Sequence, residues 1–204
     1  MAIEAENNEY HERQRKGRLM LLAMLIFFVT PIIAVIAMYK LDWRPNGESI
    51  GELAVPAKLI SMNYALMSSD GSVIKPDVWK DKWSMVYIAG NCEKECHDKL
   101  HNMRQLHISL YKEIPRMQRV FITTSKEVSQ LAQDYPEMLI VNQPSTEIST
   151  LSDQFNVKNE SSMTAGRIYL VDPLGHFMMS YTPETTLAKI RKDVIRLMKY
   201  SWAG

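Results

Sequence analysis

Residues 83–97 read WSMVYIAGNCEKECH, and this stretch decides the fold. Its first half is an apolar run typical of a buried β-strand, and its second half opens a long pattern of helical spacing. Cys92 and Cys96, the only cysteines of the chain, therefore lie at a strand-to-helix turn. Two cysteines this close together, in a chain with no others, are expected to act jointly as a redox pair or as metal ligands.

The spacing of the two cysteines limits where each can lie. Cβ atoms four residues apart in a regular helix are about 5–6 Å apart, whereas a disulfide requires about 3.8 Å. We therefore expect Cys92 in the turn and Cys96 in the first helical turn. There the helix dipole and the backbone N–H groups lower the pKa of a cysteine thiol. Glu93 and Glu95 oppose this effect, and Lys94 offsets part of that opposition.

An apolar run without a charge extends from Leu19 to Tyr39. About twenty such residues cross the ~30 Å hydrocarbon layer as a helix, and a membrane helix tolerates one proline, here Pro31. Four cations precede the run: Arg13, Arg15, Lys16 and Arg18. By the positive-inside rule, the sequence predicts a cytoplasmic basic tail over residues 1–18, a transmembrane helix over 19–39, and the remainder across the membrane.

A cleaved signal peptide is the alternative, since residues 35–37, VIA, form a passable cleavage site. The apolar run is longer than the usual ~7–15-residue apolar core of a signal peptide, which favours an uncleaved anchor. We therefore expect a single-pass protein of the inner (cell) membrane whose C-terminal domain lies in the periplasm. Two nearby cysteines can cycle between thiol and disulfide in that compartment.

The rest of the chain divides into a polar linker, residues 40–56, and one domain, residues 57–204. About 150 residues are enough for a domain with its own core. The formal net charge of +1 gives no electrostatic case for nucleic acid as a partner or for an acidic substrate. The sequence also contains no glycine-rich phosphate loop and no serine in a nucleophile elbow.

Strand and helix patterns alternate along the domain. A small hairpin is expected over residues 60–74, followed by a helical turn over 76–79. Expected strands cover residues 83–89, 119–123, 138–141, 167–171 and 176–181, and expected helices cover 96–114, 126–135, 146–155 and 183–198. This order predicts an α/β fold, with a thioredoxin-like domain behind one N-terminal transmembrane helix.

Residues 83–96 resemble the active-site strand and loop of the Sco/SenC family. Three further features are similar: the Asp70-Gly71 hairpin, the hairpin at residues 168–175 (IYLVDPLG), and the single N-terminal anchor. The resemblance covers residues 57–200. It implies a membrane-anchored, thioredoxin-fold copper chaperone that helps to build the dicopper site of cytochrome oxidase. Copper as cargo, and an oxidase subunit or another copper chaperone as partner, follow from the same resemblance.

The sequence departs from the family at the third copper ligand. That ligand is a distant histidine just before the strand that corresponds to residues 168–171, and its position falls on Thr164, preceded by Met163. His97 replaces the proline that usually follows the second cysteine in the family. A thioether is a soft ligand suited to Cu(I). Our hypothesis is that Met163 replaces the histidine and joins Cys92 and Cys96 as a metal ligand.

The other histidines have simpler interpretations. His107 shares a helix face with Leu100, Met103 and Leu110, which indicates a core histidine with a hydrogen-bond partner. His97 and His101, four residues apart, have the spacing of paired metal ligands, although a solvated helix shoulder is favoured. His176 is expected at the far end of its strand, over 10 Å from the cysteines at about 3.3 Å per residue, and is excluded.

Three functions remain open. The first is a divergent Sco-like assembly factor that delivers copper or prepares the copper site of a respiratory oxidase. The second is a thiol–disulfide oxidoreductase, in which a Cys92 thiolate attacks a partner disulfide and Cys96 resolves the mixed disulfide. The third is a non-catalytic thioredoxin-like binding module, in which Cys92 and Cys96 form a structural disulfide.

Overall fold

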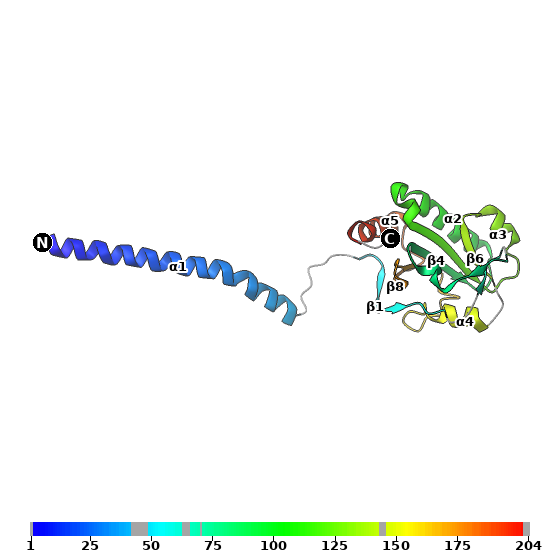
Figure 1. Ribbon diagram of the computed structural model, residues 1–204, viewed down its shortest axis with the longest axis horizontal. Helices are drawn as coiled ribbons and strands as arrows, with labels where there is room; N and C mark the ends of the chain where they lie inside the picture. Colours follow the sequence, from blue (N-terminus) through cyan, green and yellow to red (C-terminus); the bar gives the residue numbers. More distant parts are fainter. Residues whose placement is uncertain (1, 42–48, 63–65, 70, 143–145, 202–204) are drawn as a thin grey trace. The chain divides into compact units, whose positions relative to one another are not determined.

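The computed structural model describes residues 2–41, 49–62, 66–69, 71–142 and 146–201, with the side chains of residues 2–13 left aside. The chain divides into two compact units, one before and one after position 49. The first is a single helix, α1 (Ala2–Lys40), drawn in blue in Figure 1. Its segment Gln14–Lys40 is long and apolar enough to cross a membrane.

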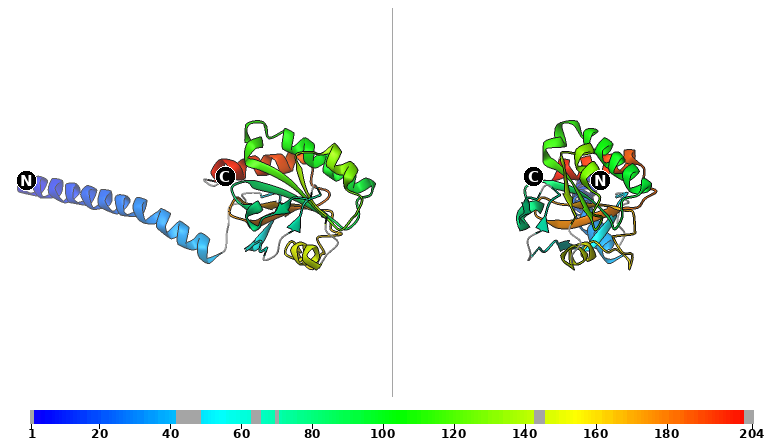
Figure 2. Two further views of the ribbon diagram at one scale, coloured as in Figure 1. Left: turned by 45° about the vertical axis from the view of Figure 1, so that its right-hand side comes forward. Right: turned by 90° about the vertical axis from the view of Figure 1, so that its right-hand side faces the viewer.

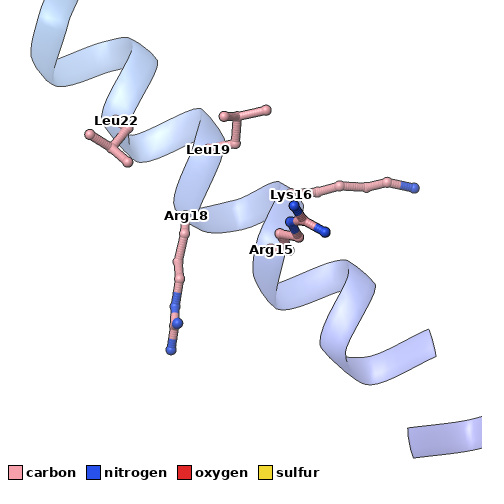
Figure 3. Close-up of a pocket in the computed structure, with 5 residues that line it drawn as sticks. All are labelled: Arg15, Lys16, Arg18, Leu19 and Leu22. Atoms are coloured by element: carbon pink, nitrogen blue, oxygen red, sulfur yellow. The ribbon is translucent and has the colours of Figure 1, made fainter. Parts of the chain in front are cut away.

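Helix α1 is longer than the predicted transmembrane segment. It also includes the basic tail, because that tail is rich in the strong helix formers alanine, glutamate, arginine and lysine. Figure 3 shows the boundary, where Arg15, Lys16 and Arg18 project from the helix and Leu19 and Leu22 follow on the next turns. The described side chains from Leu19 to Val35 are all exposed, as expected for a helix whose apolar surface requires lipid.

The second unit is built on a six-stranded sheet with the order β1-β8-β7-β4-β5-β6. Strands β4, β5 and the edge strand β6 are parallel, and β7, β8 and β1 are added by antiparallel pairs. The bounds are β1 Glu52–Leu59, β4 Trp83–Ala89, β5 Met117–Thr123, β6 Met138–Val141, β7 Ile168–Val171 and β8 His176–Tyr181. Strand β4 is buried along its whole length, as its apolar sequence predicts.

Helices cover both faces of this sheet (Figure 2). The helices α2 (Lys94–Ile108), α3 (Ser129–Asp134) and α5 (Leu187–Tyr200) pack on one face, over a core that we name the helical core. Helix α4 (Thr146–Asp153) packs on the other face with the short strands β2 (Leu66–Met67) and β3 (Val73–Ile74) and the 3₁₀ turn η1 (Pro76–Trp79), over the aromatic core. Along β4, the side chains of successive residues therefore point alternately into the helical core and the aromatic core.

The helices differ from the predictions at their ends. Helix α2 stops at Ile108, and a 3₁₀ segment, η2 (Tyr111–Arg116), takes its place, because Tyr111 has a φ of 51° that ends a right-handed helix. Helix α5 starts at Leu187, after the N-cap Thr186, because Pro183 lies in a turn closed by the N–H of Thr185 on the Thr182 carbonyl.

The predicted linker over residues 40–56 is wrong in its second half. Strand β1 pairs with β8 and covers the edge that β8 would otherwise expose. Just before it, the backbone N–H groups of Ile50 and Gly51 donate to Asp193 of α5 at 3.0 and 3.1 Å. These bonds make Ser49, rather than residue 57, the start of the folded unit.

Candidate functional site

Cys92 and Cys96 lie where the sequence predicts, in the turn after β4 and in the first turn of α2. The two residues form a disulfide, and their Cα atoms are 5.0 Å apart, within the ordinary range for a bridged pair. Cys92 is half-buried, whereas Cys96 is buried in the helical core. The reachable sulfur is therefore that of Cys92, and Cys96 lies behind it.

The turn that carries Cys92 is fixed by its neighbours. The hydroxyl groups of Thr123 and Thr124 both donate to the Gly90 carbonyl, at 3.1 and 3.0 Å. The Gly90 N–H donates to the Met163 carbonyl at 3.3 Å. Gly90 thus joins the end of β5 and the loop before β7 to the cysteine turn, which holds that turn in place.

The electrostatics of the site have opposing contributions. The amino end of α2 favours a thiolate at Cys96, but Glu93 is the N-cap and Glu95 lies in the first turn. Burial raises the pKa of Tyr87, and the negative charge of Glu95 raises it further. Tyr87 and Cys96 belong to the same core, and Glu95, next to Cys96 in the chain, opposes the effect of the helix end.

Lys99 is a half-buried cation of α2 that the sequence interpretation did not consider. It lies one helical turn after Cys96, and its Nζ donates to the Pro183 carbonyl at 2.9 Å. Burial lowers the pKa of this ammonium group, and Glu184 and Glu95 counteract the shift. A half-buried cation at i+3 favours an anion on the same helix face. The i, i+3 spacing from Cys96 is the sequence signal by which Lys99 could have been found.

Met163 lies beside the cysteine turn through its backbone, but its side chain packs against the aromatic core. The two cysteines contact the helical core, on the other face of the sheet. In this conformation the Met163 thioether therefore packs on one face of the sheet, whereas the two cysteine sulfurs lie on the other. Thr164, at which the resemblance to Sco/SenC proteins leads us to expect the histidine position, is exposed, and its N–H donates to the Ser161 carbonyl at 3.1 Å.

The histidines follow their simpler interpretations. His107 is buried, and its Nε2 lies 3.0 Å from the Met117 carbonyl. His97 and His101 are exposed on α2. His176 pairs with Asp172 at 3.2 Å, at the end of β8 remote from the cysteine turn. Among the described residues, no three of histidine, cysteine, aspartate and glutamate gather as a metal-binding group.

Two thiolates remain as the donors that the site offers to a metal. Soft thiolate ligands select Cu(I) over harder ions, and both sulfurs become available when the disulfide is reduced. The same two sulfurs also support thiol–disulfide exchange, because one is accessible and the other lies within bonding distance behind it. The geometry thus supports a redox or copper-handling site built on two residues.

Comparisons with known proteins agree with this fold. Copper-bound Sco1 of yeast is 18% identical, with a TM-score of 0.58, over 76% of this chain and 96% of that chain. BsSco, described as a Sco-family cytochrome c oxidase assembly protein with a disulfide switch, is 18% identical, with a TM-score of 0.55, over 74% and 99%. Peroxidoxin BcpB from Mycobacterium tuberculosis is 13% identical, with a TM-score of 0.53, over 71% and 97%.

These likenesses confirm the thioredoxin-like fold and the expected similarity to Sco/SenC proteins. No curated protein sequence matches the chain. A family model, described as the transmembrane-like, thioredoxin-like, C-terminal domain, matches residues 83–201. This match includes both cysteines and covers more than half of the chain. The chain therefore belongs to the transmembrane-like, thioredoxin-like C-terminal domain family.

Proposed function

We propose that this protein is a membrane-anchored, extracytoplasmic assembly factor for a respiratory cytochrome oxidase. It handles copper, or the redox state of copper-site thiols, through Cys92 and Cys96. The observation that carries the proposal is the position of the pair, at the β4–α2 turn of a Sco-like domain, with one sulfur accessible and the other buried behind it.

The two activities use the same reduced dithiol. In exchange, the Cys92 thiolate attacks a disulfide of the client, one client thiol leaves, and Cys96 then attacks the mixed disulfide. The client disulfide is thereby reduced to two thiols, and Cys92 and Cys96 are oxidised to a disulfide. In copper handling, the two thiolates take up Cu(I) as cargo and release it to the client.

The anchor supports the location in this proposal. Segment Gln14–Lys40 has the length and composition of a membrane span, and its cations precede the apolar part. The positive-inside rule then favours a cytoplasmic N-terminus and a periplasmic domain. The partners that fit this location are the membrane, an oxidase subunit and another copper chaperone.

A general thiol–disulfide oxidoreductase is the second candidate function. The observation in its favour is the Met163 side chain, which packs in the aromatic core rather than beside the sulfurs. The likeness to a peroxidoxin is compatible with it, because that protein has the same fold. For Met163 to act as a third copper ligand, the loop that carries it has to turn its side chain across the end of the sheet.

An anaerobic Cu(I) titration of the reduced full-length chain in detergent, against a competing chelator, separates the candidates. Copper handling predicts tight, stoichiometric binding that Cys92→Ser, Cys96→Ser abolishes. Met163→Ala tests the third ligand, and Met103→Ala, which removes a buried methionine of the helical core, is its matched control. Cu(I) affinity equal to that of the double serine variant rules out copper transfer.

The reduction potential separates an exchanging pair from a structural disulfide. A potential above about −300 mV supports exchange, and one below it supports a non-catalytic module in which the disulfide only stabilises the fold. Equilibration of the full-length chain with glutathione and dithiothreitol buffers measures it. This measurement needs no copper, so its outcome is independent of the titration.

A further inference from the structure

The exposed side of α5 is strongly basic. Positions 189, 192, 196 and 199 fall on one face of a helix, and they carry Lys189, Lys192, Arg196 and Lys199, all exposed. The opposite side packs into the helical core through Ile190, Val194 and Met198. The acidic residue of α5, Asp193, is only 2% exposed, so it presents little negative charge at the surface.

Aromatic side chains flank this basic ridge. On one side Tyr111 of η2 is 74% exposed, and Arg191 connects η2 to α5. The Arg191 Nε donates to the Ser109 carbonyl at 2.9 Å, and its guanidinium lies 5.9 Å from the centre of the Tyr111 ring. On the other side Tyr200, 78% exposed, borders a shallow pocket of about 390 Å³ with Leu174 and Leu197.

Three acidic groups around the ridge, among the residues that the structure describes, have partners of their own. Glu113 of η2 bonds Arg116 at 2.8 Å, and Asp172 beside the pocket bonds His176 at 3.2 Å. Asp193 accepts from Arg196 at 2.8 Å and from the backbone of Ile50 and Gly51. On α5 itself, the exposed lysines at positions 189, 192 and 199 therefore dominate the outward charge.

We propose that this surface, the α5 ridge with Tyr111 and Tyr200, binds the headgroups of anionic phospholipids. Lysine and arginine near a membrane surface are attracted to anionic lipids, and tyrosine is enriched where headgroups meet water. Lysine, by contrast, is depleted at protein–protein interfaces. The combination of several exposed lysines with two exposed tyrosines favours a lipid surface over an acidic protein as the occupant.

The course of the chain adds a second argument. Residues 49–51 are bonded to Asp193, so the folded unit begins on α5 itself. Only residues 42–48 separate Leu41, after α1, from Ser49, and the eight residue steps between them span at most about 29 Å. With the anchor of the proposed function in a bilayer, this short connection gives α5 a high effective concentration at the lipid surface. The inference therefore rests on that anchor.

Lysine acetylation of the full-length chain in lipid nanodiscs tests the proposal. The discs contain phosphatidylcholine alone or phosphatidylcholine with phosphatidylglycerol, and mass spectrometry reads the labelling of each lysine. Labelling of Lys192 and Lys199 is expected to fall at least about fivefold in the anionic discs and to recover at high salt. Lys58 and Lys75, exposed outside this surface, are the internal references and are expected to label equally.

A pair of charge-reversal variants provides the control. Lys192→Glu, Lys199→Glu is expected to abolish the protection of Lys189 in anionic discs, whereas Lys58→Glu, Lys75→Glu is expected to retain it. Equal labelling of the ridge in both lipids, in a chain that has entered the discs, overturns this inference alone and leaves α5 open to an acidic protein. A chain that does not enter the discs overturns the anchor, and this inference with it.

Discussion

Two loops meet at the carboxyl end of β4, and they differ in how they are held. The first loop, residues 90–93, together with the first turn of α2 carries the cysteine pair, with Cys92 half-buried and charged residues between the two cysteines. The loop of residues 161–167 is bonded tightly to the rest of the domain. The Ser162 hydroxyl donates to the Ser152 carbonyl at 2.7 Å, and Arg167 binds Glu52 and Glu160 at 3.0 and 2.8 Å.

Under the proposed function, this difference assigns the chemistry of the domain to the first loop. The resemblance to Sco/SenC proteins predicts a copper-binding histidine position in the second loop, but there the Met163 side chain packs on the aromatic core and Arg167 forms ion pairs. The first loop retains two sulfurs whose disulfide bond can be reduced and formed again. The comparison suggests a division of roles: thiol chemistry in one loop, and structural support for it in the other.

Removing Arg167 is expected to have the largest effect on stability. Its side chain is 6% exposed and pairs with two carboxylates, so Arg167→Met leaves both without their buried partner. We expect a loss of about 3 kcal/mol in the free energy of unfolding, because two charge-assisted hydrogen bonds are lost together, each contributing roughly 1.5 kcal/mol. Urea unfolding measures this loss.

Lys158→Met is the matched control for that variant. Lys158 binds the same Glu52 at 2.9 Å but is 69% exposed, so its removal is expected to cost less than about 1 kcal/mol. Equal losses in the two variants would mean that the second loop does not depend on its buried ion pairs.

Opening the disulfide is expected to have a smaller effect. A five-residue loop closed by a disulfide contributes roughly 2 kcal/mol through the entropy of the unfolded chain. The oxidised protein is therefore expected to unfold at a higher urea concentration than the reduced protein. The Cys92→Ser, Cys96→Ser variant should unfold at the same urea concentration as the reduced protein. If it unfolds with the oxidised protein instead, the disulfide does not stabilise the fold.

The sequence predicted one loop well and the other poorly, for physical reasons. Strand β4 and the two cysteine positions followed from an apolar run and from the geometry of a helix, both of which are local. The side on which Met163 packs depends on contacts with the aromatic core, which no local pattern encodes. Residues 52–59 form an edge strand, but their sequence, ELAVPAKL, contains Pro56 and no regular alternation of apolar and polar residues, so it does not resemble one.

Installing a histidine in the second loop tests whether it can regain a ligand role. Thr164 is exposed, and its neighbour Met163 is bonded to Gly90 beside the cysteines. Imidazole is a good copper ligand, so Thr164→His is expected to raise copper affinity at least about tenfold, or about 1.4 kcal/mol. The chelator titration measures it. Ser161→His, at another exposed position of the same loop, is the control, and an equal gain there would contradict a specific ligand position.

The smallest expected effect concerns His107, the buried histidine of α2. Burial lowers its pKa in the folded state, partly offset by its bond to Met117. Below about pH 6.5 the unfolded chain therefore binds the proton more readily than the folded one, and stability falls as the pH falls. The loss near pH 6 is expected to be below about 1 kcal/mol.

His107→Gln is expected to remove this part of the pH dependence, measured by urea unfolding of variant and parent between neutral and mildly acidic pH. If the free energies of unfolding of variant and parent change with pH in parallel across this range, the interpretation of His107 as a neutral, buried imidazole is contradicted. Copper affinity should not change, because eleven residues along the helix separate His107 from Cys96 by about 16 Å. A histidine on the cysteine helix would then contribute to the core alone, while the thiol chemistry depends on the loop before it.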